Sequence, residues 1–433
     1  PGKQDIEALQ RKYRDISEFI EGKFSLETHF AGSASRQTCM KDDRDIDIFV
    51  LFPSDTEREK LADKGLDIGK KVFDSFDGDY EIEYAEHPYT KGIIDGYEVE
   101  IVPCFDVEAG EIKSAVDRTP HHSRWVQENL DREQRKDVVV LKKFLSTAGL
   151  YGSSLKVQGF SGYLSEILIS EYGGFKELTE AAKNWEKNHV LDPKNHHEGD
   201  LPEKLEKKFE DEPFVVIDPI DEERNVASVL SKENLSRFIY LCYKFNKEIG
   251  MDFFREEERD YTEFEVKQEL KKRGDMIVIE FGTPEEVDDI VYPQMRKAMR
   301  RLRSEIKKHD FPIFESGFHV GDTTRIFFEL KRKLPDIQEL KGPKVFHGED
   351  HMEQFTSKYE NVYVKDDTLV AKTEREYTDA KNLLDDFITG DLEEKGIPKY
   401  VADKMQDYSF KDVLDGDEWL NYLGEKLKVQ RRG

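Results

Sequence analysis

Two aspartates separated by one apolar residue form a pair that could do chemistry. They lie in the run Asp45-Ile46-Asp47-Ile48, and the alternation of side chains along a strand would place both carboxylates on one face. Two carboxylates this close repel each other, which costs free energy unless a cation lies between them. Magnesium favours such hard oxygen ligands and readily shares them with substrate phosphates. The pair therefore predicts a Mg²⁺ site for phosphoryl transfer.

A third carboxylate normally completes a metal site of this kind. Glu100 is the candidate, because it lies in the run Glu98-Val99-Glu100-Ile101-Val102, whose apolar residues would be buried. Glu98 falls on the same strand face and is the alternative ligand. Taken singly, an Asp-X-Asp pair is also typical of a solvated acidic turn, and Asp42-Asp43-Arg44-Asp45 fits that interpretation as well.

A Gly-Ser step that precedes the aspartates suggests how a phosphate would be held. Gly32 lets the backbone approach phosphates closely, and a helix that begins there would offer free N–H groups. The Ser33 hydroxyl can donate to a phosphate oxygen, and Arg36 can neutralise phosphate charge. The order of apolar-Gly-Ser, Asp-apolar-Asp and a later buried carboxylate favours a nucleotidyltransferase over an acidic turn.

A sheet and its covering helices must position these residues. An apolar stripe from Ile6 to Ile20 predicts a first helix. Further signals predict a strand at Leu26–Phe30, a buried strand at Ile46–Phe52 that ends at Pro53, a helix at Thr56–Phe76, and strands at Tyr80–Tyr84 and Tyr97–Pro103. Together these elements predict an α+β head with a mixed sheet.

Helical signals dominate from residue 133 to about residue 250, interrupted by a polar stretch at Asn184–Lys208 that we expect to be a loop. The alternation that follows predicts a small ferredoxin-like domain: a helix at Glu265–Lys272, a strand at Met276–Phe281, a helix at Val291–Lys308 and a strand at Thr324–Leu330. Pro335 and Gly342-Pro343 mark a boundary before a mixed α/β tail.

Length and composition bound the remaining choices. A chain of 433 residues predicts three or four domains. No apolar run approaches the length of a membrane span, so we expect no membrane partner. Three widely spaced cysteines, without a Cys-X-X-Cys pair, argue against disulfides and zinc and indicate a cytoplasmic protein.

The formal net charge of −26 is unusual for a protein that binds nucleic acid, but it is unevenly distributed. Residues 291–333 carry 11 Lys or Arg against 5 Asp or Glu. Met295, Met299, Leu302 and Ile306 would form the apolar face of a helix there, with both methionines in the core. Four cations follow on an adjoining stripe that could track an RNA backbone, or simply be a solvated basic face: Arg296, Arg300, Arg303 and Lys307.

Beyond these patterns, the sequence resembles the polymerase-β-like nucleotidyltransferases and, among them, the class I, archaeal CCA-adding enzymes. The resemblance rests on segments that occur in order between about residues 30 and 240: Tyr84–Tyr89, Val102-Pro103-Cys104, Lys113–Pro120, Tyr151-Gly152, Gly159–Leu164, Asp218–Asp221 and Arg224–Ala227. The last third matches more loosely, through Asp288–Tyr292 and Pro293-Gln294.

The resemblance implies a catalytic head over residues 1–130, a base-reading helical neck over 131–250, a ferredoxin-like, RNA-binding body over 251–340 and a tRNA-binding tail over 341–433. It implies that Asp45, Asp47 and Glu100 hold Mg²⁺, and that Arg224 helps to read the base edge. It also implies a set of contacts to the triphosphate and sugar of ATP or CTP: Ser33, Arg36, His122, Lys142 and Tyr151.

The same residues also have simpler interpretations. Lys142 would be a solvated helix residue, His122 a surface or capping residue, Tyr151 a packed aromatic in a turn, and Arg224 a local ion-pair partner of Asp221–Glu223. The family typically carries Asp where this chain has Glu100, and the extra methylene moves the carboxylate by about one bond length.

The resemblance implies template-independent addition of C, C and A to the 3′ end of tRNA from CTP and ATP, with the acceptor stem as RNA partner. A poly(A) polymerase, an oligoadenylate synthetase and a tRNA-binding protein whose catalysis has lapsed are the alternatives. A homodimer is kept open as an assembly.

Overall fold

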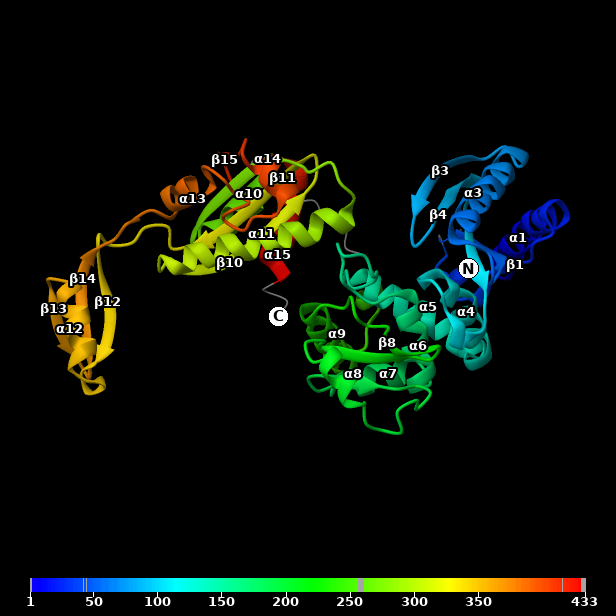
Figure 1. Ribbon diagram of the computed structural model, residues 1–433, viewed down its shortest axis with the longest axis horizontal. Helices are drawn as coiled ribbons and strands as arrows, with labels where there is room; N and C mark the ends of the chain where they lie inside the picture. The colour runs from blue at the N-terminus through cyan, green and yellow to red at the C-terminus, as the bar shows by residue number, and fades with distance from the viewer. Residues whose placement is uncertain (1, 42, 44, 256–260, 415, 430–433) are drawn as a thin grey trace. The chain divides into compact units, whose positions relative to one another are not determined.

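The protein is described by a computed structural model that covers residues 2–41, 43, 45–255, 261–414 and 416–429. It divides into two compact units, Pro1–Glu256 and Glu257–Gly433, and each unit is described by itself (Figure 1). Both units contain helices and sheets, and the sheets of unit 1 are mixed, which confirms the predicted α+β class. Asp42 and Arg44, two residues of the possible acidic turn, lie outside the described residues.

The first part of unit 1 is a five-stranded sheet with the order β1-β2-β5-β4-β3. Its β2 and β5 are parallel and its other pairs are antiparallel, so the sheet is mixed, as expected. Its strands are β1 (Thr28–Phe30), β2 (Asp45–Pro53), β3 (Asp79–Tyr84), β4 (Pro88–Ile94) and β5 (Tyr97–Asp106). The helices of this part are α1 (Lys3–Phe24), α2 (Gly32–Arg36), α3 (Arg58–Ser75) and α4 (Arg118–Asn129), with short 3₁₀ turns at Ala109–Glu111 and Ala115–Asp117.

Alternation along the strands explains which side chains reach the core. Ile46 and Ile48 of β2, and Val99 and Ile101 of β5, are fully buried with residues of α1 and α3, while the carboxylates between them are only half-buried. β4 was missed by the sequence analysis because Thr90, Lys91 and Gly92 interrupt its apolar pattern.

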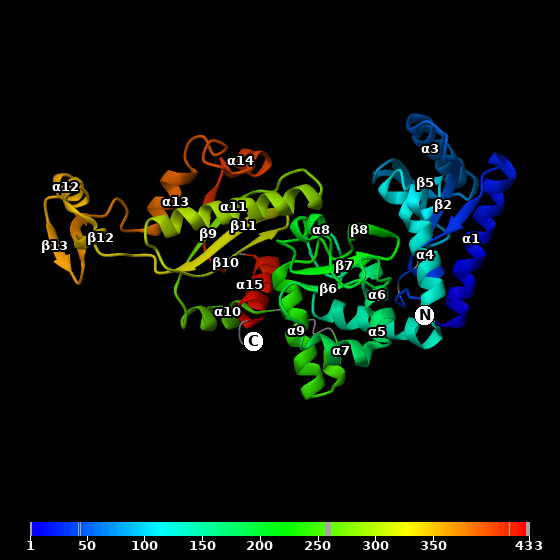
Figure 2. The same ribbon diagram turned by 60° about the horizontal axis from the view of Figure 1, so that its bottom comes forward.

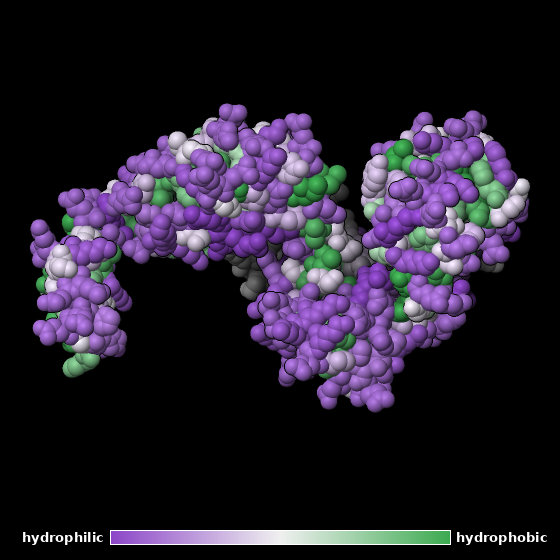
Figure 3. Space-filling model, in the orientation of Figure 1, coloured by the Kyte–Doolittle hydropathy of each residue, from purple (hydrophilic) through white to green (hydrophobic). Residues whose placement is uncertain are grey.

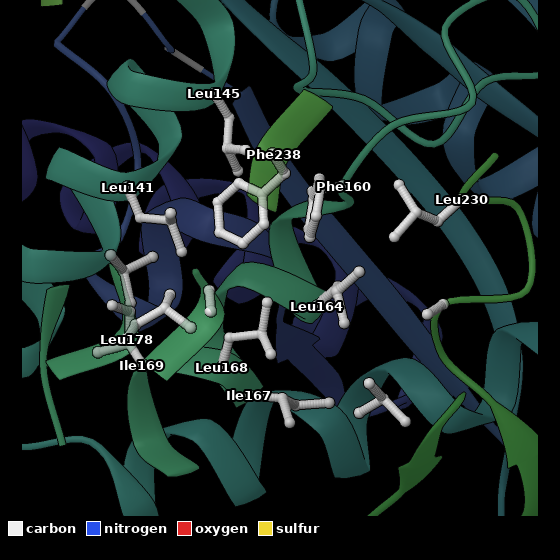
Figure 4. Close-up of a cluster of buried hydrophobic side chains, with 14 of the residues drawn as sticks. Leu141, Leu145, Phe160, Leu164, Ile167, Leu168, Ile169, Leu178, Leu230 and Phe238 are labelled. Atoms are coloured by element: carbon white, nitrogen blue, oxygen red, sulfur yellow. The ribbon is translucent and has the colours of Figure 1, made fainter. Parts of the chain in front are cut away.

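Helices dominate the second part of unit 1, around a core of aliphatic and aromatic side chains. In Figure 4 residues from α5, α6 and α9 point toward one another, among them Leu141, Leu164 and Phe238, all fully buried. The helices are α5 (Arg132–Thr147), α6 (Gly162–Tyr172), α7 (Phe175–Ala182), α8 (Glu203–Lys208) and α9 (Lys232–Lys247), followed by a 3₁₀ turn at Met251–Phe254.

A three-stranded sheet of β6 (His189–Leu191), β7 (Phe214–Asp218) and β8 (Asp221–Asn225) completes this part. The expectation that Asn184–Lys208 is a loop was therefore wrong in part, because that stretch contains β6 and α8. β6 is only three residues long and pairs in parallel with the distant β7, an interaction that local sequence does not encode.

Unit 2 contains an antiparallel sheet with the order β10-β11-β9-β15, which is the strand order of a ferredoxin-like fold (Figure 2). Helix α11 (Asp288–Lys308) joins the first strand to the second. The strands are β9 (Asp275–Gly282), β10 (Ile313–Val320), β11 (Thr323–Leu330) and β15 (Ser409–Lys411), and the flanking helices are α10 (Glu263–Leu270), α13 (Ala380–Ile388), α14 (Lys399–Met405) and α15 (Asp417–Val429).

The segment expected to be a tail contributes to this same core. Leu384 of α13 and Met405 of α14 pack with Met295 and Leu302 of α11, and β15 supplies the fourth strand. The second crossover of the fold carries an excursion with its own sheet: β12 (Ile337–Lys344), a 3₁₀ turn at Val345–His347, α12 (Glu349–Lys358), β13 (Val362–Lys365) and β14 (Thr368–Glu374), in the order β12-β14-β13.

Hydrophilic residues cover most of the face of each unit seen in Figure 3, in keeping with a charged content of 37%. Within the described parts of the chain, no helix is both long enough and apolar enough to cross a bilayer.

Candidate active site

The predicted carboxylates come together on neighbouring parallel strands. Asp45 of β2 pairs in register with Glu98 of β5, and Asp47 pairs with Glu100. Ile46, between the two aspartates, points into the core, so the aspartates share the opposite face. The predicted strand geometry of Asp45 and Asp47 is therefore present, and both glutamates lie beside them.

This side of the sheet holds negative charge in a partly buried place. Burial and the charge of Glu100 raise the pKa of Asp47, against the lowering effect of Arg36, to about 6. Burial raises the pKa of Asp45 as well, and so do a hydrogen bond with Asp43 and the charge of Asp43. A cation between these oxygens would relieve the repulsion.

Lys91 of β4 is a residue of this face that sequence reasoning missed. It lies opposite Glu100 in the register of β4 and β5, and its ammonium Nζ is 3.1 Å from Glu100 Oε1 and also pairs with Glu98. Burial lowers the pKa of Lys91, but the hydrogen bonds with both glutamates and their charges together raise it by more, so it is raised overall. The strand that carries Lys91 was not predicted, and the interrupted alternation from Pro88 to Ile94 was the only signal for it.

The Gly-Ser step begins the short helix α2 directly beside Asp47. Gly32 has a φ of +69°, and a Cβ built on it would lie 1.6 Å from Asp47 Oδ2, so only glycine fits. The amide N–H of Ala31 donates to the carbonyl oxygen of Asp47 at 2.9 Å, which ties the turn to β2. The Ser33 hydroxyl donates to Asp43 Oδ2 at 3.1 Å.

Arg36 is buried in a network that joins α2 to the helices behind it. Its Nε donates to Oε1 of Glu166 at 2.9 Å, and its Nη1 donates to the Ser123 hydroxyl at 3.2 Å. The Thr38 hydroxyl also donates to Glu166, which is fully buried on α6. Sequence reasoning missed Glu166, because a single Glu within the apolar run of α6 gives no local sign of its distant partners.

Lys142 is buried as well, with only 1% of its surface exposed, so the interpretation as a solvated helix residue was wrong. Its Nζ donates to the carbonyl oxygen of Thr38 at 2.8 Å and lies 6.0 Å from the ring centre of Tyr151. Burial lowers the pKa of Lys142 and raises that of Tyr151. Lys142 thus reaches the segment that follows α2, and Tyr151 lies beside Lys142.

His122, Tyr163 and Arg224 converge on Asp218, which is fully buried at the end of β7. His122 Nε2 lies 3.0 Å from Asp218 Oδ2, and its ring stacks on Tyr163 with centroids 4.0 Å apart. Arg224 Nη1 donates to the same Oδ2 at 2.7 Å. Arg224 therefore does form an ion pair, but with Asp218 and not with the adjacent acids that the sequence offered.

Three known protein domains match successive parts of the chain. The nucleotidyltransferase domain matches residues 11–122, the second domain of tRNA nucleotidyltransferases matches residues 136–255, and the C-terminal domain of CCA-adding enzymes matches residues 273–411. The CCA-adding enzyme of Methanocaldococcus jannaschii is 41% identical over 413 residues, which cover 93% of this chain and 91% of the relative. The chain belongs to the archaeal CCA-adding enzymes.

Other CCA-adding enzymes are similar over much of their length. That of Archaeoglobus fulgidus is 36% identical over 82% of this chain and 77% of the relative, and that of Haloarcula marismortui is 36% identical over 82% and 78%. A solved structure of the Cid1 poly(U) polymerase aligns with 59% of this chain and 94% of its own, with a TM-score of 0.47 at 12% identity, which is too distant to inform the function. Like its family, the protein is a tRNA nucleotidyltransferase.

The nucleotidyltransferase fold of CCA-adding enzymes implies a divalent metal ion. Asp45 and Asp47 fit such an ion, since they offer hard oxygen donors at a place where negative charge is in excess. In the portions of the chain that are described, no three His, Cys, Asp or Glu side chains already form a ligand group, and the Glu100 carboxylate is paired with Lys91. Glu100 would have to leave Lys91, at least in part, to share the ion.

The basic stripe of this CCA-adding enzyme lies on α11 in unit 2. Met295, Met299, Leu302 and Ile306 are buried in the core, as predicted. Arg300 and Lys307 are exposed on the adjoining face. Arg303 donates from Nη1 to the Ser316 hydroxyl at 2.9 Å, and Arg296 lies 6.0 Å from the ring centre of Tyr292, so these two cations also serve the packing of the unit.

Proposed function

We propose that the protein adds C, C and A in turn to the 3′ end of tRNA, using CTP and ATP and no nucleic-acid template. In each step the terminal 3′ oxygen bonds to the α-phosphorus, and the bond from that phosphorus to the leaving pyrophosphate breaks. The observation that carries the proposal is the pairing of Asp47 with Glu100 and of Asp45 with Glu98 across β2 and β5, next to Gly32-Ser33, in a chain of this family.

We assign the metal to Asp45, Asp47 and Glu100 and propose that it is Mg²⁺. When bound, the ion would activate the attacking hydroxyl and neutralise triphosphate charge. The chain's own residues would bind the phosphates, the sugar and the base of the nucleotide. Ser33 would exchange its bond to Asp43 for a phosphate oxygen.

Cations and aromatic residues would hold the nucleotide around these carboxylates. Buried Lys142 and Arg36 would offset phosphate charge, which acts over a longer range where water is excluded. Tyr151 and His122 would contact the sugar. Arg224, whose side chain is 37% exposed, has guanidinium nitrogens to offer to a base edge.

The partners and the location follow from the same proposal. The stripe Arg296, Arg300, Arg303 and Lys307 would bind the backbone of the tRNA acceptor stem. Three buried free cysteines suit the reducing cytoplasm in which we place the protein. A homodimer remains a prediction, which sedimentation over a range of protein concentrations tests.

Incubation of tRNA transcripts that end before, within and after CCA, with labelled CTP, ATP and Mg²⁺, tests this function. We expect stepwise addition that stops after A. A-only tailing would instead indicate a poly(A) polymerase or an oligoadenylate synthetase, and tight tRNA binding without incorporation would indicate a lapsed enzyme.

The substitution Asp47→Asn tests the site in the same assay. It keeps the shape of the side chain and removes the charge that a metal needs, so incorporation should fall by at least about a thousandfold. Asp74→Ala, at an exposed position of α3, serves as the matched control and should leave incorporation unchanged. Full activity of the Asp47 variant would contradict the assignment of the carboxylates.

A further inference from the structure

Asp218 is buried where α4, α6 and the β7–β8 hairpin meet, and none of the roles assigned above uses it. We propose that Asp218 is the positioning residue that fixes the guanidinium of Arg224 and thereby sets the choice of C and A over U and G. This inference rests on the proposed function, because it presupposes that Arg224 faces the incoming base.

The carboxylate of Asp218 is saturated with donors. Oδ1 accepts from the Tyr163 hydroxyl at 3.2 Å and from the backbone N–H of Ile220 at 3.0 Å. Oδ2 accepts from His122 at 3.0 Å and from Arg224 at 2.7 Å. A carboxylate has about four acceptor sites, so each of them is engaged and the group has little freedom to turn.

Arg224 makes the shortest contact with the Asp218 carboxylate, 2.7 Å from Nη1 to Oδ2. Burial lowers the pKa of His122, against the raising effect of the hydrogen bond and charge of Asp218, and its Nε2–H donates to the carboxylate, which can only accept. Burial would raise the pKa of Asp218, but the hydrogen bond and charge of His122, with smaller contributions from the Ile220 N–H and Arg224, lower it to about 2. Asp218 therefore remains ionised and holds Arg224 by a charged hydrogen bond.

A fixed guanidinium is a selective surface because it can only donate. Cytosine and adenine present a ring-nitrogen acceptor at the centre of the edge used in base pairing, whereas uracil and guanine present an N–H there. A guanidinium whose plane is fixed meets that N–H with another donor, which leaves both groups unsatisfied. A guanidinium that is free to rotate away would avoid this donor–donor contact, and the preference for C and A over U and G would fall.

The hairpin itself is held by a second, separate contact. Arg118, one helical turn before His122 on α4, binds Asp221 Oδ2 through Nε at 3.0 Å and through Nη2 at 2.9 Å. Among the contacts of the described residues, the Asp221 carboxylate binds neither Arg224 nor His122. Loss of the Asp221 charge should therefore loosen the hairpin without releasing the guanidinium, which makes Asp221→Asn a matched control for Asp218→Asn.

The experiment measures kcat and KM for each of the four nucleotides on a tRNA that lacks CCA, together with thermal unfolding. For Asp218→Asn we expect the preference for CTP over UTP, as a ratio of kcat/KM, to fall by at least about tenfold, with a raised KM for CTP. Asp221→Asn should keep this ratio within about twofold. In an Arg224→Ala background, Asp218→Asn should change the ratio no further, because the two residues act as one unit.

A proportional loss with all four nucleotides, or an unchanged ratio in a folded Asp218 variant, would overturn the inference. If Asp218→Asn does not fold, Tyr163→Phe removes one donor to Asp218 while keeping the ring on His122, and the ratio should still fall about threefold. An unchanged ratio in a folded Tyr163 variant would then overturn the inference. A wild-type protein that adds no CCA would refute the proposed function. Normal addition by the wild type, together with an unchanged CTP/UTP ratio in the Asp218 variant, would refute only the inference.

Discussion

At the scale of the residue, two glutamates of β5 are candidates for the third carboxylate of the site. Glu100 and Glu98 lie on the same face of β5, and Lys91 pairs with both of them. Glu100 is the better placed, because it lies in register with Asp47, the aspartate beside Gly32, and its side chain is less exposed, 24% against 37%. We therefore expect Glu100 to share the metal and Glu98 to compete only for Lys91.

Paired substitutions separate the two glutamates. Glu100→Gln should lower kcat for CTP incorporation by at least about a hundredfold, because it removes a charged ligand from the reacting centre. Glu98→Gln should lower kcat only a few-fold, since Glu98 is not expected to hold the metal and its loss only strengthens the pairing of Lys91 with Glu100. Single-turnover incorporation at saturating Mg²⁺ measures both. A larger loss of kcat in the Glu98 variant than in the Glu100 variant would show that Glu98 is the metal ligand.

At the scale of the element, the strands and helices around the site followed from local patterns. The alternation in β2 and the apolar stripe of α1 are enough to predict both, because each pattern lies within one continuous segment. The pairing of β4 with β5 is not local, so Lys91 could not be found. The ion pair of Arg224 shows the same limit: the sequence offered adjacent acids, but folding brings Asp218 to it from the previous strand.

The turn into α2 accepts only glycine at position 32. In Gly32→Ala the new Cβ would overlap Asp47 Oδ2, and the φ of +69° would be strained. Displacement of Asp47 by about 1 Å should lower incorporation by about a hundredfold. Gly22→Ala is the matched control, since a Cβ there meets nothing within 4 Å in helix α1. Radiolabelled CTP incorporation, with circular dichroism to verify folding, checks the pair. Equal activity of both variants would show that α2 adapts and that the close approach to Asp47 is not needed.

At the scale of the whole molecule, an acidic chain has to bind a polyanion. The net charge of −26 opposes association with tRNA, while residues 291–333 carry a net charge of +6 and so leave −32 on the remainder. The exposed cations of α11 should therefore contribute a large share of the favourable electrostatics. Within unit 2, the buried methionine face of α11 fixes the direction in which Arg300 and Lys307 point.

The salt dependence of tRNA binding tests this contribution. Because each phosphate contact releases counterions, the combined substitution Arg300→Ala and Lys307→Ala should reduce the slope of log affinity against log salt by about 1.5 and weaken binding by about tenfold near physiological salt. Lys64→Ala with Lys207→Ala removes two exposed lysines of unit 1 and is the control for net charge. Filter binding of tRNA at several salt concentrations measures both variants. If the two double variants lose the same slope, total charge governs binding. A selective loss in the α11 variant supports a backbone contact, because only cations that face the RNA displace its counterions.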